Sequence, residues 1–178
     1  MQIVFVSGLW TDFNPMWHII ERVFRVHLPD AIFSIEEIRS CQPWEVSRMR
    51  KHIDELVEKH RKSDEVVFVA HSFGGLISRA VAQRLTVPVR GIASICTPHV
   101  GIGHLYAGIL GYGDSDVPLL TFSARRDELV MWGARHPKAL AHFELDSNHF
   151  TDFVDNLPLA QKIADETVRH FELSRPGT

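Results

Sequence analysis

Cysteine is scarce in this 178-residue chain, which has only Cys41 and Cys96, far apart in the sequence. The two form neither a Cys-x-x-Cys pair nor a metal-ligand spacing, so we expect buried free thiols in a reducing compartment. Histidine pairs at ligand spacing on one helix are also lacking, and we expect no metal and no other cofactor. No Gly-x-x-x-x-Gly-Lys-Ser/Thr or Gly-x-Gly-x-x-Gly follows a strand pattern, which excludes the common nucleotide-binding loops.

A charge excess and long apolar runs are lacking as well. The 19 Lys and Arg residues against 22 Asp and Glu residues give a formal net charge of −3, which makes no electrostatic case for binding nucleic acid. The longest apolar runs are only strand-sized, so we expect no stable membrane insertion. The chain enters a strand pattern at Met1–Val6 with no secretory leader before it, which predicts a cytoplasmic location. The sequence leaves the oligomeric state open.

What the chain does have is a regular alternation of strand and helix patterns. Its 45% hydrophobic content and its length predict one globular domain over residues 1–178. Short apolar runs predict strands at Ile3–Val6, Ile32–Ile35, Val66–Ala70, Gly91–Cys96, Leu119–Ser123 and Ala141–Leu145. Helices are predicted at Met16–His27, Trp44–Lys62, Gly75–Leu85, Asp127–Trp132 and Leu159–Phe171. This order predicts an α/β fold of about six mainly parallel strands with helices on both faces, and functional residues at the carboxyl ends of the strands.

One segment combines a strand pattern, a turn and a helix pattern around a serine. The run Val66–Ala70 stops at Ala-His-Ser-Phe-Gly-Gly, and a helix-forming stretch follows at once. A tight turn brings the strand and the helix so close that residues two before and two after the serine must be small, as Ala70 and Gly74 are. Ser72 would then hold its hydroxyl exposed on a strained turn, with the helix N-terminus behind it. These features predict a nucleophile.

An aspartate and a histidine follow later strands at the same predicted edge of the sheet. Asp127 comes four residues after the strand at Leu119–Ser123, and His149 comes four residues after the next strand. The chain order Ser, Asp, His is one of those found for a nucleophile, an orienting acid and a base. His71 adjoins Ser72 in sequence, but we expect its side chain to point elsewhere.

With these motifs in order, the chain resembles the α/β-hydrolase superfamily and, within it, small lidless bacterial lipases and esterases. Ala70–Gly75 resembles their nucleophile turn, and Cys96–Gly101 resembles a Thr-Pro-His-x-Gly stretch that follows the next strand in lipase-like members. Ser123–Val130 resembles the loop that carries the acid. The resemblance covers nearly the whole chain and implies a minimal hydrolase core with little or no cap, in which the first two strands of the full-length fold are missing.

The resemblance implies a serine hydrolase that cleaves carboxylic esters through an acyl-enzyme, like an esterase or lipase. Ser72 would be the nucleophile, and His149 the base that takes its proton and returns it to the leaving group. Asp127 would orient the imidazole and stabilise its charged form.

Two main-chain N–H groups are expected to stabilise the negative charge that develops on the substrate oxygen. One is that of Phe73, directly after the nucleophile, and the other, carried over from the resembling lipases, is that of Leu9. Those lipases have His-Gly before this second donor, whereas this chain has Ser7 in place of the histidine. Trp10 is the alternative donor.

The expected substrate is a small-molecule ester or a lipid. Only Thr97–Val117 separates the fourth and fifth strands, where larger relatives insert a cap, and its glycines predict a flexible segment with little room for a lid. Trp10, Leu105 and Tyr106 are candidates for an apolar rim around an acyl chain. A thioesterase or an amidase would use the same three catalytic residues, and a catalytically silent hydrolase-like binding protein is a further alternative.

Overall fold

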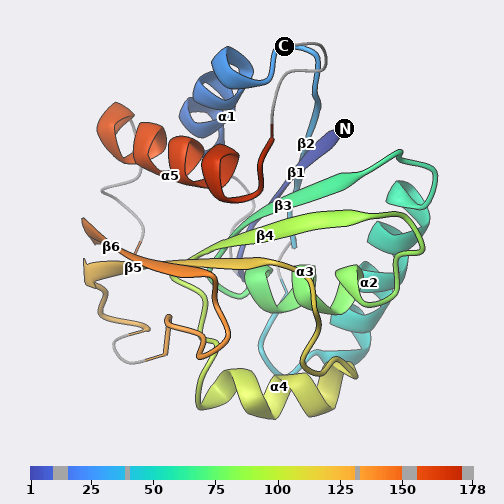
Figure 1. Ribbon diagram of the computed structural model, residues 1–178. Coiled ribbons are helices and arrows are strands. Elements are labelled where there is room, and N and C mark those ends of the chain that lie inside the picture. Colours follow the sequence, from blue (N-terminus) through green and yellow to red (C-terminus); the bar gives the residue numbers. More distant parts are fainter. Residues whose placement is uncertain (10–15, 39–40, 131–132, 150–155, 174–178) are drawn as a thin grey trace.

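Six parallel strands form one sheet in this protein. The computed structural model describes residues 1–9, 16–38, 41–130, 133–149 and 156–173. The strands are β1 (Gln2–Val6), β2 (Ile32–Glu36), β3 (Val66–His71), β4 (Val89–Ile95), β5 (Leu119–Arg126) and β6 (Ala141–Asn148). In space they follow the order β2-β1-β3-β4-β5-β6, and every neighbouring pair is parallel (Figure 1). The predicted α/β fold with about six mainly parallel strands is confirmed.

Helices cover both faces of this sheet (Figure 1). Those in the described part of the chain are α1 (Met16–His27), α2 (Val46–His60), α3 (Gly74–Ala82), α4 (Ile102–Leu110) and α5 (Leu157–His170). One face carries α1 and α5, which pack against each other, and the opposite side carries α2, α3 and α4. Each layer encloses its own apolar core.

The central strand β3 shows why its sequence is apolar throughout. Val67 and Val69 belong to the core under α1 and α5, whereas Val66 and Phe68 belong to the core under α2, α3 and α4. Successive side chains of a strand point to opposite faces, so a strand that is covered on both faces has no polar side. The same pattern placed this strand correctly from the sequence.

The segment between β4 and β5 differs from the prediction, because it contains a helix, α4, instead of a flexible stretch. Its glycines meet specific needs of the backbone. A Cβ at Gly103 would lie 2.1 Å from the carbonyl oxygen of Pro98, and Gly101 and Gly111 flank the helix with φ angles of +67° and +73°. Glycine adopts such φ angles without strain, so Gly101 and Gly111 mark the two ends of the helix. Gly103, which lies inside the helix, allows it to pack closely against Pro98. A short helix therefore occupies the segment for which the sequence predicts little room for a lid.

The helix predicted at Asp127–Trp132 is wrong over its described part, since Asp127 has no regular structure and residues 128–130 form bends. The carboxylate of Asp127 accepts hydrogen bonds from the main-chain N–H groups of Leu129 and Val130, at 2.9 and 2.7 Å. An aspartate that bonds the N–H groups two and three residues ahead favours a turn or a helix start over continuous helix. Local bonding of this side chain overrides the helical pattern.

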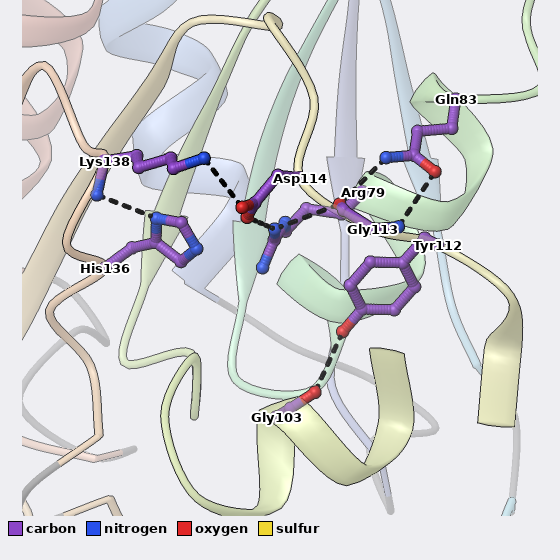
Figure 2. A network of polar contacts seen from close by, with 8 residues as sticks. All are labelled: Arg79, Gln83, Gly103, Tyr112, Gly113, Asp114, His136 and Lys138. Carbon is purple, nitrogen blue, oxygen red and sulfur yellow. Dashed lines mark hydrogen bonds and ion pairs between the residues drawn. The ribbon is translucent and has the colours of Figure 1, made fainter. Parts of the chain in front are cut away.

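A polar network ties α3 to the two loops that flank β5 (Figure 2). Arg79 of α3 is only 8% exposed, and its guanidinium lies 5.0 Å from the centre of the Tyr112 ring and 3.9 Å from the Asp114 carboxylate. Asp114 also pairs with Lys138 at 2.7 Å, so both loops meet at this carboxylate. The network holds the start of β5, the strand that leads to Asp127.

Two simpler observations concern cysteine and membranes. Cys41 and Cys96 are both buried and free, as predicted. Among the described residues, no helix is both long enough and apolar enough to cross a bilayer.

The tight packing of α3 against β1 gives a stability prediction. A Cβ at Gly74 would lie 2.4 Å from the carbonyl oxygen of Val6 and 2.6 Å from that of Ser7, which are main-chain atoms. We expect Gly74→Ala to lower the free energy of unfolding by about 3 kcal/mol, the upper end for overpacking, as measured by urea unfolding.

Gly108→Ala in α4 is the matched control, because no atom lies within 4 Å of its added Cβ. We expect this change to raise the free energy of unfolding by up to about 1 kcal/mol, through the better helix propensity of alanine. Equal effects of the two substitutions would show that the approach to β1 is not what requires glycine at position 74.

Candidate active site

Three predicted side chains meet at the carboxyl ends of the strands. Ser72 directly follows β3, Asp127 follows β5 and His149 follows β6. The Oγ atom of Ser72 lies 3.0 Å from Nε2 of His149, and Nδ1 of His149 lies 2.8 Å from Oδ2 of Asp127. The structure therefore brings the three residues into one hydrogen-bonded row, which we call the Ser–His–Asp row.

The turn at Ser72 has the strained form that the sequence predicts. Its φ angle is +52°, in the left-handed region that non-glycine residues seldom occupy. The N–H of Ser72 donates to the carbonyl oxygen of Ile95 at 2.7 Å, which ties the turn to β4. A Cβ on Gly8 would lie 2.8 Å from Cβ of Ser72, so the segment after β1 lies directly against the serine.

Burial and hydrogen bonding fix how the row is protonated. Burial would raise the pKa of Asp127, but hydrogen bonds from His149 and from the N–H groups of Val130 and Leu129 outweigh it and lower that pKa. Asp127 is therefore ionised at neutral pH and accepts a hydrogen bond from the Nδ1–H group of His149. The lone pair of Nε2 then faces the hydroxyl of Ser72.

The segment after β1, where the second main-chain donor is predicted, is anchored by a hydrogen bond to α1. The indole N–H of Trp17 donates to Oγ of Ser7 at 2.8 Å, and both side chains are buried. Ser7 thus anchors this segment at the position where the resembling lipases have histidine. The predicted donors Leu9 and Phe73 are both buried and flank Ser72, one on the adjoining segment and one next in sequence.

The candidates for an apolar rim lie in different environments. Tyr106 is buried, and its ring packs edge-on against that of Phe73, with the ring centroids 4.6 Å apart. Its hydroxyl donates a hydrogen bond to the carbonyl oxygen of Pro43. Leu105, next in α4, is 61% exposed. Trp10 lies outside the described residues. Tyr106 therefore packs α4 against Phe73, the residue after Ser72, and Leu105 is open to solvent.

Two buried side chains next to the Ser–His–Asp row, those of His71 and Cys96, are not among the predicted site residues. Nε2 of His71 lies 2.8 Å from the carbonyl oxygen of His149. Cys96 is fully buried, burial and the nearby Asp127 carboxylate raise the pKa of its thiol well above the ordinary value, and its φ angle is +51°. The available signal was a histidine that ends an otherwise apolar strand, because a polar residue buried there needs a partner.

Among the residues that the structure describes, one group could hold a metal ion by composition: His71, Cys96 and His149, whose ligand atoms lie within 4.8 Å of one another. Burial raises the pKa of the Cys96 thiol well above its ordinary value, which adds to the cost of forming the thiolate that a metal would bind. His149 is bonded on both ring nitrogens within the row. We assign no metal to this group.

A family model matches almost the entire chain. Residues 3–175 match the model described as the alpha/beta hydrolase family. The chain belongs to the alpha/beta hydrolase family. For this hydrolase-family protein, membership supports a hydrolase activity on a small-molecule substrate. No curated protein matches the chain.

Solved structures share the fold of this hydrolase-family protein over nearly its whole length. A member of the alpha/beta superfamily from Xanthomonas campestris pv. campestris is 18% identical, with a TM-score of 0.68 over 95% of this chain and 98% of that chain. The ydeN gene product from B. subtilis is 15% identical, with a TM-score of 0.68 over 97% and 99% of the two chains. The esterase domain of a Rhodothermus marinus protein is 16% identical, with a TM-score of 0.61 over 95% and 85%. At these identities the likeness establishes the fold alone.

The bond between Ser7 and Trp17 gives a test of how the segment after β1 is anchored. We expect Ser7→Ala and Trp17→Phe each to lower the free energy of unfolding by about 1–3 kcal/mol, because each leaves the other buried polar group without its partner. The double variant should cost less than the sum, with a coupling of about 1 kcal/mol in a urea-unfolding double-mutant cycle. Strictly additive costs would mean that the bond does not stabilise the fold.

The lowered pKa of Asp127 predicts a pH dependence of stability. A carboxylate whose pKa is lower in the folded than in the unfolded protein stabilises the fold at every pH above its ordinary pKa of 3.8. This contribution is lost as the pH falls through the pKa of the folded state. Asp127→Asn should therefore destabilise the protein most at neutral pH, and the difference from the parent should shrink in acid. Urea titrations across the acid range measure it, with the exposed Asp146→Asn as control. A difference that stays constant with pH would contradict the lowered pKa.

Proposed function

We propose that this protein is a serine hydrolase that cleaves carboxylic esters through an acyl-enzyme. The observation that carries the proposal is the Ser–His–Asp row, with distances of 3.0 Å and 2.8 Å between its members. A serine hydroxyl is a weak nucleophile and needs a base within hydrogen-bond reach. The row supplies that base, and an ionised partner that holds its ring in the required tautomer.

In the first half of the reaction, Oγ of Ser72 attacks the carbonyl carbon of the ester while its proton passes to Nε2 of His149. The imidazolium that forms is stabilised by the ionised Asp127, which keeps its charge throughout. The carbonyl π bond opens, and its electron pair moves to the substrate oxygen, which becomes an oxyanion. The C–O bond then breaks, and Nε2 returns its proton to the leaving alcohol.

The oxyanion requires donors that are in place before it forms. We assign this role to the main-chain N–H groups of Phe73 and Leu9, which lie on the two segments that meet at Ser72. Loss of one such donor typically raises the barrier by about 2.7–4 kcal/mol. The anchoring of Ser7 by Trp17 holds the second segment against the turn.

In the second half, water takes the place of the alcohol. His149 removes a proton from the water, the hydroxide oxygen attacks the acyl carbon, and the tetrahedral intermediate collapses. The bond to Oγ breaks, Ser72 regains its proton from His149, and the carboxylic acid leaves. No metal or other cofactor takes part in this sequence.

The surface beside the row favours an apolar acyl group. Val100, Ile102 and Leu105 are exposed at the start of α4, and α4 contains no Lys, Arg, Asp or Glu. Tyr106 connects this helix to Phe73, next to the nucleophile. An aliphatic chain that leaves the acyl carbon along the start of α4 would meet these apolar side chains, whereas the charged groups that contact α4, Arg50 and Arg84, bond the carbonyl oxygens of its last two residues.

Labelling with a fluorophosphonate probe tests the proposal. We expect one adduct per chain, located on Ser72 by peptide mapping, because only a serine activated by a base reacts readily with this reagent. Ser72→Ala should abolish labelling, and His149→Gln should slow it by roughly 10⁴-fold. Rates with matched ester, thioester and amide substrates then identify the bond that is cleaved.

Ser63→Ala is the control, since Ser63 bonds Gln2 at the amino end of the sheet, far from the row in the fold. It should label at the parent rate. If the folded parent protein gave no adduct, the hydrolase proposal would fail, and a catalytically silent binding protein would be the better account.

A further inference from the structure

His71, the last residue of β3, forms a buried hydrogen bond to the main chain of His149. Its side chain is fully buried, and its Nε2 atom lies 2.8 Å from the carbonyl oxygen of His149. A carbonyl oxygen can only accept, so Nε2 of His71 carries the hydrogen. The two imidazole rings lie side by side, with centroids 4.9 Å apart and planes 53° apart. The residue before the nucleophile is thus bonded to the residue that carries the base.

The position of His149 explains why such a bond matters. The last residue pair between β5 and β6 is Arg126 with Asn148, so His149 lies one residue beyond the strand ladder. Its imidazole must nevertheless meet Ser72 and Asp127, which sit on two other loops. A bond from β3 to the main chain of His149 links this residue directly to the strand that carries Ser72.

The charge state of His71 suits it to this role. Burial, followed by the proximity of His149, lowers the pKa of His71 to about 3, so the ring stays neutral at physiological pH. A neutral ring donates its hydrogen bond without placing a positive charge beside His149. Such a charge would oppose the imidazolium that forms there during the reaction. It also means that His71 does not compete with His149 as a base in the proposed reaction.

We propose that His71 is a positioning residue, whose single N–H donor holds the main chain of His149 so that the imidazole stays between Ser72 and Asp127. The inference rests on the proposed serine hydrolase function and adds a fourth residue to its machinery. The bond spans 78 positions in the sequence and joins β3 to the end of β6. Without this bond the protein would still have Ser72, His149 and Asp127, but the imidazole of His149 would no longer be aligned with the other two side chains. Misplacement of a reacting group by about 1 Å can cost about 100-fold in rate.

Two substitutions separate the donor from the space that the ring fills. His71→Leu fills much of the space of the ring with an apolar side chain and removes the N–H donor. His71→Gln carries an amide N–H that can reach the same carbonyl oxygen. The measurement is the second-order rate constant for fluorophosphonate labelling of Ser72, together with kcat and KM for an ester that the parent cleaves. We expect His71→Leu to lower the labelling rate and kcat by about 10- to 100-fold with little change in KM, and His71→Gln to restore most of the loss.

His60→Leu is the matched control for the loss of a buried histidine. His60 is also fully buried, bonds the side chain of Gln2 on β1 and lies 3.6 Å from the carboxylate of Glu36 on the edge strand β2, and neither partner belongs to the Ser–His–Asp row. It should lower the thermal stability as His71→Leu does while leaving the labelling rate at the parent value. A purely structural role for His71 would make the two variants alike in both measurements, and would overturn the proposal.

The remaining outcomes are equally decisive. Labelling of His71→Leu at the parent rate, or equal losses in His71→Leu and His71→Gln, would overturn the positioning role. If neither variant folds, long-range ¹H–¹⁵N NMR of the parent decides. A neutral His71 ring with its hydrogen on Nε2 supports the proposal, and a hydrogen on Nδ1 alone overturns it. A parent protein that fails to label Ser72 would instead refute the proposed hydrolase function, so the two failures are distinguishable.

Discussion

The close approach of the turn after β3 to the end of β1 is the constraint on which the rest of the site depends. The carbonyl oxygens of Val6 and Ser7 leave no room for a side chain at position 74, where the chain has glycine. Ser72 likewise leaves no room for a side chain at Gly8. This close packing holds the serine in a left-handed backbone conformation, with its hydroxyl within hydrogen-bond distance of His149. It also brings two main-chain segments together around that hydroxyl. Strain at such a position persists only because the surrounding packing determines it.

The second constraint is electrostatic. A buried carboxylate is expensive unless hydrogen bonds replace its water, and Asp127 receives them from His149 and from two N–H groups of its own turn. The bonds that make this charge tolerable also fix the direction in which the imidazole faces Ser72. The same contacts therefore stabilise the fold and serve the proposed chemistry. The neutral His71 adds a hydrogen bond from β3 to the carbonyl oxygen of His149.

Much of this arrangement could be predicted from the sequence, because apolar runs identified the strands and Ser72, Asp127 and His149 each come directly after one. Local patterns failed where a single contact decides the outcome. The glycines around α4 were interpreted as flexibility, although they bound a helix and allow its close packing. A histidine at the end of the apolar strand β3 indicates that its side chain needs a partner, but the sequence does not identify that partner, which lies 78 positions away.

The measurement that tests the account most directly is a crystal structure of the protein after reaction with a phosphonate ester analogue. The account predicts phosphorus bonded to Oγ of Ser72, with the phosphoryl oxygen within hydrogen-bond distance of the N–H groups of Phe73 and Leu9, and His149 still bonded to Asp127. An unmodified Ser72 in the folded protein, or a phosphoryl oxygen that faces away from both N–H groups, would contradict it.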